Sequence, residues 1–216
     1  MMNVPCPLCQ KGETALFLRE PARDFYACKT CGLIFVPPQF FLDPAGEKKR
    51  YDLHQNSSAD KGYRDFLNRL RQPMCARVPK GSQGLDFGSG PGPTLSVMFR
   101  EAGYAMDVFD LYYAADDDML LRQYDFITAT EVVEHLREPA VELDRLWDAL
   151  RPGGWLGIMT GLAPAAEAFA AWHYKNDPTH ILFFSRRTFE WLARRWRAVL
   201  EVEGDTVFLQ KQDARK

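Results

Sequence analysis

Residues 84–94 constrain the fold of this chain more than any other stretch. Glycine recurs there at every second position: Gly88, Gly90 and Gly92. An apolar segment precedes them, and residues 95–102 carry apolar side chains at helical spacing. Glycine lets the backbone pass close to a ligand at positive φ, and the helix behind it offers free N–H groups. The pattern predicts a strand, a glycine-rich turn and a helix, as at the ligand sites of open α/β sheets.

The spacing of the glycines excludes two common nucleotide sites. It is not the G-x-G-x-x-G of dinucleotide enzymes, and no Gly-Lys-Ser/Thr follows as in a P-loop. With Asp86 two residues before the first glycine, the stretch resembles motif I of the class I methyltransferases that use S-adenosyl-L-methionine (SAM). The resemblance implies that Asp86, Gly88, Gly90 and Gly92 contact SAM. The alternative is a tight turn without a ligand.

A second strand is expected to end at Asp110, eighteen residues after Gly92. An acidic residue at this point commonly accepts hydrogen bonds from ribose hydroxyls. Asp110 is therefore a candidate ribose ligand, with an exposed strand-end carboxylate as the alternative, and Leu111 is a candidate neighbour of the adenine. The following region is short for a third strand and its helix, so we expect that strand to be reduced.

Two further motifs match the methyltransferase family in its order. Residues 125–130 read as a strand, and Glu-Val-Val-Glu-His-Leu follows at 131–136. By resemblance, Thr130 and Glu131 line the SAM pocket near the sulfonium, while His135 is a candidate base or a packing residue. The third motif, Leu-Arg-Pro-Gly-Gly before an apolar strand, has a structural role.

Residues 172–185 combine two histidines with aromatic, acidic and basic side chains. Many small-molecule methyltransferases carry a similar stretch on the acceptor side of the cleft. His180 is the first candidate for a general base or substrate ligand. The alternative is a hydrogen bond between Asp177 and His180 that only fixes the loop.

The C-terminal end reads as an antiparallel hairpin over residues 198–210, with Gly204 and Asp205 in the turn. Residues 81–212 thus resemble a complete class I methyltransferase domain: an α/β, Rossmann-like sheet closed by an antiparallel hairpin. The implied reaction is in-line displacement of the sulfonium methyl by an O, N or C nucleophile, for which the family pattern requires no metal.

The N-terminal segment carries four of the five cysteines in two close pairs. They are Cys6, Cys9, Cys28 and Cys31, and eighteen residues separate the pairs. Four thiolates at this spacing can surround a tetrahedral zinc ion, and the segment resembles a zinc ribbon over residues 1–38. Four cysteines leave no open position for water, so zinc is expected to be structural. A redox pair or free thiols are the alternatives.

Residues 39–80 are expected to form an irregular linker followed by a helix over the sheet edge or the cleft. The linker contains site-type side chains: Tyr51, His54, Gln55 and Asn56. They are candidate contacts to cofactor or substrate, with a surface linker as the alternative. The helix is predicted from an apolar stripe between Tyr63 and Leu70.

Composition limits the partners. The net charge of −2 over 216 residues gives no basic field for nucleic acid. No apolar run approaches the roughly 20 residues of a membrane span, and no signal-peptide pattern opens the chain, so a cytoplasmic protein is expected.

A small-molecule acceptor is the first expectation. One alternative is an RNA base methyltransferase in which the ribbon binds RNA through a local basic patch, formed by Arg19, Arg23, Lys29 and residues 48–50. The other is a non-catalytic SAM-binding or zinc-ribbon interaction protein. The acceptor atom and the oligomeric state stay open.

Overall fold

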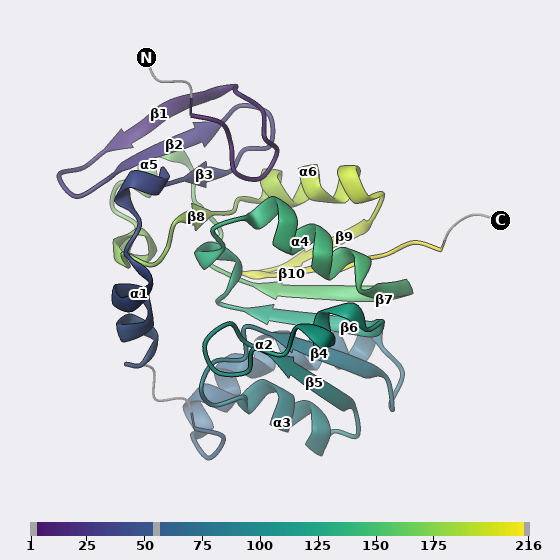
Figure 1. Ribbon diagram of the computed structural model, residues 1–216. Helices are drawn as coiled ribbons and strands as arrows, with labels where there is room; N and C mark the ends of the chain where they lie inside the picture. The colour runs from purple at the N-terminus through teal and green to yellow at the C-terminus, as the bar shows by residue number, and fades with distance from the viewer. Residues whose placement is uncertain (1–3, 54–56, 214–216) are drawn as a thin grey trace.

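A mixed sheet forms the centre of the computed structural model, which describes residues 4–53 and 57–213 (Figure 1). Within those residues it has six strands. In spatial order they are β5 (Ala105–Phe109), β4 (Gln83–Phe87), β6 (Tyr124–Thr130), β7 (Leu150–Met159), β10 (Thr206–Gln210) and β9 (Val199–Glu203). The first four run parallel, and β10 lies antiparallel to both of its neighbours. The predicted Rossmann-like sheet with a closing antiparallel hairpin is confirmed.

Helices cover both faces of this sheet. The helices α2 (Lys61–Arg77) and α3 (Thr94–Glu101) share a buried cluster with Phe126 of β6. On the other face, α4 (Pro139–Asp148) and α6 (Arg186–Trp196) pack with its neighbour Ile127. Successive side chains of a strand point to opposite faces, which explains why adjacent residues of β6 belong to different clusters.

The expected third strand is indeed reduced. After β5 the chain makes an isolated bridge between Asp110 and Ala114, then a 3-10 helix, η2 (Asp117–Leu121), before it enters β6. Residues 111–123 are all described, and they contain no strand beyond that bridge. The edge of the sheet is therefore β5, and the turn after Asp110 lies directly beside the glycine loop.

The N-terminal segment forms a second, smaller sheet at the top of Figure 1. Its first three strands come from the ribbon segment: β1 (Thr14–Arg19), β2 (Asp24–Cys28) and β3 (Ile34–Phe35). The fourth, β8 (Leu182–Phe183), comes from far along the chain and pairs antiparallel with β3. A strand that directly follows the His180 loop therefore belongs to the ribbon sheet.

The ribbon also shares its hydrophobic core with the α4 and α6 face of the central sheet. Phe25 of β2 lies 5.7 Å from Phe183 of β8, measured between ring centroids, and 5.5 Å from Phe169. Phe169 ends the short helix α5 (Ala166–Phe169), and all three rings are fully buried. The apolar interior is thus continuous from the cysteines to the central sheet.

The expectation that residues 37–61 are irregular is wrong for part of that segment. It contains a short η1 (Pro38–Phe40) and an α-helix, α1 (Pro44–Tyr51). Asp43 caps α1, accepting from Gly46 N at 2.7 Å, and Pro44 takes the first helical position. Proline is favoured there because its missing N–H would have no partner. His54, Gln55 and Asn56 lie outside the described residues.

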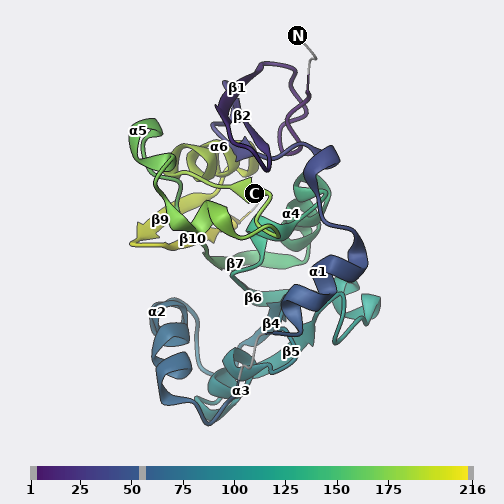
Figure 2. The ribbon, with the colours of Figure 1, turned by 90° about the vertical axis from the view of Figure 1, so that its left-hand side faces the viewer.

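Helix α1 lies at the carboxyl ends of the parallel strands (Figure 2). Helix α2 instead packs on a face of the sheet, with Leu67, Leu70 and Met74 buried. No helix in the described ranges is long and apolar enough to cross a membrane.

Replacing Phe183 by alanine is expected to lower the free energy of unfolding by about 3–5 kcal/mol, the usual cost of deleting a buried phenylalanine side chain. Because the core is shared, unfolding should remain a single transition when followed by circular dichroism in denaturant. Leu16→Ala, at a side chain 45% exposed on β1, should change stability by no more than about 0.5 kcal/mol. A separate early transition of the ribbon would contradict the shared core.

Candidate functional site

The glycine loop connects β4 to α3 and has the positive φ angles that its sequence predicts. The φ of Gly88 is +73° and that of Gly90 is +66°. A Cβ added to Gly88 would lie 2.3 Å from a methyl carbon of Val132. Conformation and space both require glycine at position 88, so the backbone passes closely against the segment that follows β6.

Asp110 ties this loop to the end of β5. Its Oδ2 accepts from Gly90 N at 2.8 Å, and its Oδ1 accepts from Tyr112 N at 2.9 Å and Tyr113 N at 3.1 Å. The carboxylate is 8% exposed. Its three donors are backbone groups, so Asp110 organises the turns on both sides of it. Leu111 next to it is 69% exposed.

Two buried hydroxyls stand at the ends of the elements that frame this region. Within the described part of the chain, the Oγ1 atoms of Thr94 and Thr130 have no hydrogen-bond partner. Thr94 begins α3 directly after the glycine loop, and Thr130 ends β6. Buried polar atoms are nearly always hydrogen-bonded, so these two mark places where a ligand can supply the missing partner.

Asp86 lies deeper, beneath the loop. Burial raises its pKa to about 7, and the carboxyl accepts from the Thr128 hydroxyl at 3.0 Å. Its side chain therefore connects β4 to β6 inside the sheet.

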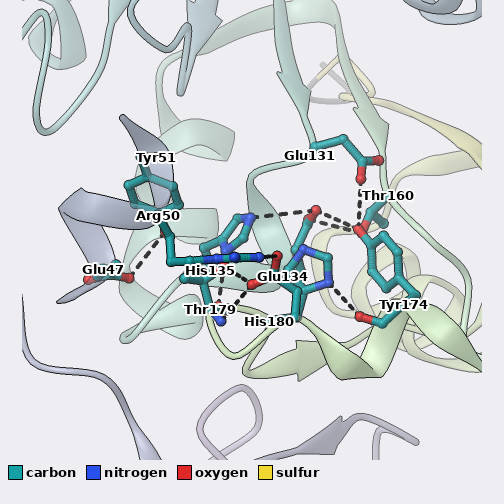
Figure 3. A network of polar contacts seen from close by, with 11 residues as sticks. Glu47, Arg50, Tyr51, Glu131, Glu134, His135, Thr160, Tyr174, Thr179 and His180 are labelled. Carbon is teal, nitrogen blue, oxygen red and sulfur yellow. Dashed lines mark hydrogen bonds and ion pairs between the residues drawn. The ribbon is translucent and has the colours of Figure 1, made fainter. Parts of the chain in front are cut away.

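A polar network lies at the segment that follows β6 (Figure 3). Glu131 has a φ of +52°, and Glu134 is fully buried within η3 (Val133–His135). The hydroxyl of Tyr174, in η4 (His173–Asn176), lies 2.5 Å from Glu134 Oε1 and 3.1 Å from Glu131 Oε2. Thr160 donates to Glu134 Oε2 at 3.0 Å.

Burial raises the pKa of Glu131 to about 8 and that of Glu134 to about 7. The Tyr174 hydroxyl has one proton for two carboxyl groups, so its contact to one of them requires that carboxyl to be protonated. The raised pKa values agree with such a shared proton.

The two candidate histidines, 45 residues apart in sequence, meet beside this network. The His135 and His180 rings are 4.8 Å apart between centroids. Nδ1 of His135 lies 2.9 Å from Thr179 O, and Nδ1 of His180 lies 2.8 Å from Tyr174 O. Burial, with the nearby His135 adding to it, lowers the pKa of His180 to about 4, so His180 is neutral at physiological pH.

Asp177 holds the loop that carries His180 through other partners than the hydrogen bond to His180 considered in the sequence analysis. Its Oδ1 accepts from the backbone N and the hydroxyl of Thr179, at 2.9 and 2.6 Å, and its Oδ2 accepts from Arg50 at 2.8 Å. These contacts go to Thr179 and Arg50, while the His180 ring forms a hydrogen bond with the carbonyl oxygen of Tyr174.

Helix α1, which lies in the linker before α2, packs against His135 and the turn after Asp110. Glu47, 8% exposed, accepts from the Tyr51 hydroxyl at 3.2 Å and from the Tyr112 hydroxyl at 3.0 Å. The Tyr51 ring lies 5.4 Å from the His135 ring in an edge-on arrangement. Helix α1 therefore contacts both the turn after Asp110 and the histidine pair.

The ribbon contacts the loop at residues 175–180 through Arg23. This guanidinium, on a side chain only 7% exposed, donates to four backbone carbonyls. They belong to Lys175, Asp177, Pro178 and His180. No sequence pattern indicates this contact, because Arg23 stands in a polar turn that is typical of a surface.

The four ribbon cysteines converge as their spacing predicts. Their sulfur atoms lie within 4.8 Å of one another, with Cys6 3.6 Å from Cys31 and Cys9 3.4 Å from Cys28. None of them forms a disulfide. Four sulfurs at 2.3 Å from a tetrahedral zinc ion are about 3.8 Å apart, so the donor set fits zinc.

Sheet order, glycine loop and closing hairpin together define the class I methyltransferase fold. The chain belongs to the family described as a methyltransferase domain, whose sequence pattern matches residues 55–196. No curated protein matches the sequence.

Solved structures share the fold at low identity. A proposed SAM-dependent methyltransferase from Methanococcus maripaludis is 15% identical with a TM-score of 0.54, over 80% of this chain and 95% of that one. A methyltransferase of calicheamicin biosynthesis in its S-adenosylhomocysteine-bound form is 11% identical with a TM-score of 0.51, over 70% of this chain and 55% of that one.

Replacing Cys28 by serine is expected to abolish zinc binding at the four-cysteine cluster. Structural zinc supplies on the order of 10–16 kcal/mol to such modules, so residues 4–36 should exchange their amide hydrogens faster. Because Arg23 holds residues 175–180, their exchange should also rise.

Cobalt substitution gives the direct measurement, because thiolate-bound Co²⁺ has an intense charge-transfer absorption in the near ultraviolet. Cys75→Ser, outside the cluster, should keep that absorption. An unchanged spectrum in Cys28→Ser would show that these cysteines do not bind the metal together.

Proposed function

We propose that this protein transfers the methyl group of SAM to a nucleophile of a small-molecule acceptor, with residues 81–212 as the catalytic domain. The observation that carries the proposal is the pair of unpartnered buried hydroxyls, Thr94 and Thr130, at the ends of elements framing a glycine loop with positive φ. The family match and the S-adenosylhomocysteine held by one structural neighbour support SAM as the donor.

On the donor side, Gly88, Gly90 and Gly92 would approach the cofactor with their backbone, and Asp110 would accept from the ribose. A carboxylate has about four lone-pair positions. Asp110 uses three of them for backbone N–H groups, which leaves one for a ribose hydroxyl. Leu111 would lie beside the adenine.

On the acceptor side, Thr130 and Glu131 would line the pocket near the transferred methyl, with His135 and His180 beyond them. Holding the nucleophile in line with the sulfonium supplies most of the catalysis. Where the nucleophile must lose a proton, a positioned base typically adds about 10²–10⁴-fold. His180 is half-buried and its pKa is lowered to about 4, so at physiological pH one of its ring nitrogens has a lone pair that can face the acceptor.

The cations that would form an RNA-binding patch are largely engaged within the protein. Arg23 is buried against backbone carbonyls, Lys48 pairs with Asp52 at 2.7 Å, and Arg50 pairs with Asp177 at 2.8 Å. Phosphate binding needs cations that are free to pair with the phosphates and so displace the counterions of the nucleic acid. The paired cations favour a small acceptor over RNA.

Zinc at Cys6, Cys9, Cys28 and Cys31 would act structurally in this proposal. It would hold the ribbon, and the ribbon holds residues 175–180 through Arg23. This arrangement gives the ribbon a part in forming the acceptor site of a cytoplasmic enzyme, without contact to the reacting atoms.

Asp110→Ala is expected to weaken binding of S-adenosylhomocysteine by about 1–3 kcal/mol, the cost of leaving buried hydrogen-bonding groups unpaired. Calorimetric titration measures the dissociation constant. Asp118→Ala, an exposed carboxylate in η2, removes the same charge and should leave the constant unchanged. An unchanged constant in Asp110→Ala would refute the ribose assignment, and absence of binding by the unaltered protein would refute the donor.

A further inference from the structure

Glu134, His135 and His180 bring three metal-binding side chains together outside the ribbon. One carboxylate oxygen and one nitrogen of each ring all lie within 4.8 Å of one another, and His135 Nε2 is 3.9 Å from Glu134 Oε1. Figure 3 shows the three side chains grouped below Glu131. Donor atoms around one cation at 2.0–2.2 Å are about 3–4 Å apart, so small side-chain rotations would bring the three to ligand distance.

The backbone fixes which nitrogen of each ring carries the lone pair. A carbonyl oxygen only accepts, so the Nδ1 atoms of His135 and His180, which face Thr179 O and Tyr174 O, must carry protons. In a neutral ring the lone pair is then on Nε2. Histidines that bind metals commonly have their other nitrogen held by a carbonyl in this way.

Two hydroxyl groups also contact the Glu134 carboxylate. Thr160 donates to Oε2 of Glu134, and the Tyr174 hydroxyl contacts Oε1. Such contacts orient a metal-binding carboxylate and keep it from rotating. Each of the three candidate ligands thus has at least one neighbour that fixes its direction.

We propose that Glu134, His135 and His180 bind a divalent transition-metal cation on the acceptor side of the methyl-transfer site. Two imidazoles and one carboxylate suit Mn²⁺, Fe²⁺, Co²⁺ or Zn²⁺ better than Mg²⁺ or Ca²⁺. Three protein ligands leave positions open for substrate oxygen. The site therefore takes acceptors with a hydroxyl beside a second oxygen, and the methylated atom is oxygen.

This assignment rests on the proposed function and defines its chemistry. A hydroxyl bound to a divalent cation ionises more readily, so its proton leaves to water. The oxygen then forms a bond to the methyl carbon while the bond from that carbon to sulfur breaks. The products are the methyl ether, S-adenosylhomocysteine and one proton.

The test is a titration of the zinc-loaded full chain with Mn²⁺, followed by electron paramagnetic resonance of free Mn²⁺. Mn²⁺ prefers oxygen and nitrogen ligands to thiolates, so the ribbon does not compete. The unaltered protein should bind one Mn²⁺ per chain. His135→Ala, His180→Ala and Glu134→Gln should each weaken binding by at least about tenfold.

Matched controls come from the same segments. His173→Ala removes an exposed histidine at the start of η4, and Glu138→Gln neutralises an exposed carboxylate just after η3. Both should bind Mn²⁺ like the unaltered protein. If His180→Ala fails to fold, as judged by thermal unfolding, His180→Asn is used in its place, because asparagine retains a hydrogen-bonding side chain.

Titration with S-adenosylhomocysteine separates this proposal from the function on which it rests. Cofactor binding by the unaltered protein without Mn²⁺ binding, or equal Mn²⁺ binding by all variants, would overturn the metal site and leave the methyl donor standing. Mn²⁺ binding that is lost in His180→Ala, without cofactor binding in any form, would keep the metal site and overturn methyl transfer.

Discussion

The loop at residues 175–180, on the proposed acceptor side, depends on one buried charge, the Arg23 guanidinium. It donates to four carbonyl groups of residues 175–180, of which that of the buried Lys175 lies deepest. A buried polar group without a partner costs about 1–3 kcal/mol, so these contacts determine the path of the loop. Burial lowers the pKa of Arg23, but an arginine starts from so high a value that it keeps its charge.

Backbone hydrogen bonds near Arg23 also connect the ribbon to Glu134. Val36 N donates to Ile181 O at 2.8 Å, and Ile181 N donates to Glu134 O at 2.9 Å. Backbone hydrogen bonds therefore lead from the ribbon through Ile181, directly before β8, to the segment that carries Glu134 and His135. Residues 160–181 have only short helical turns of their own, and such a loop keeps one conformation only when neighbouring elements supply its hydrogen bonds. The ribbon and α1 supply them here from two sides.

Local sequence patterns predicted the elements that depend on local physics. The glycine loop, the strand ending at Asp110, the reduced third strand and the two cysteine pairs follow from short-range spacing, and the structure contains all of them. Helix α1 was missed because its composition is polar and charged, although the pair Asp43-Pro44 is a readable helix start. Such a helix is stabilised mainly by its tertiary contacts, in this case those of Glu47 and Tyr51.

The polar network could not be predicted because its members converge only in the fold. Glu134 was visible within the Glu-x-x-Glu-His motif, but its neighbours Thr160 and Tyr174 come from the end of β7 and from η4. Arg23 was read as a surface cation because no pattern in its own segment shows that it meets residues more than 150 positions away. Long-range pairs of this kind leave no periodic signal in one sequence.

The two halves of the proposed site consist of different chemical groups, and under the proposed function this difference bears on specificity. Around the glycine loop the chain offers mainly backbone groups, whose geometry is set by φ angles at Gly88 and Gly90 and by the Asp110 carboxylate. Opposite it, carboxyl, imidazole and phenol groups come from η3, η4 and α1. A backbone cradle depends little on side-chain identity, so many sequences can bind the same donor. Recognition of the acceptor depends on the direction of each side chain, and here those directions are fixed by elements outside the sheet. Under the proposed function, changes in the ribbon or in α1 would therefore alter which acceptor is bound while the donor site stays the same.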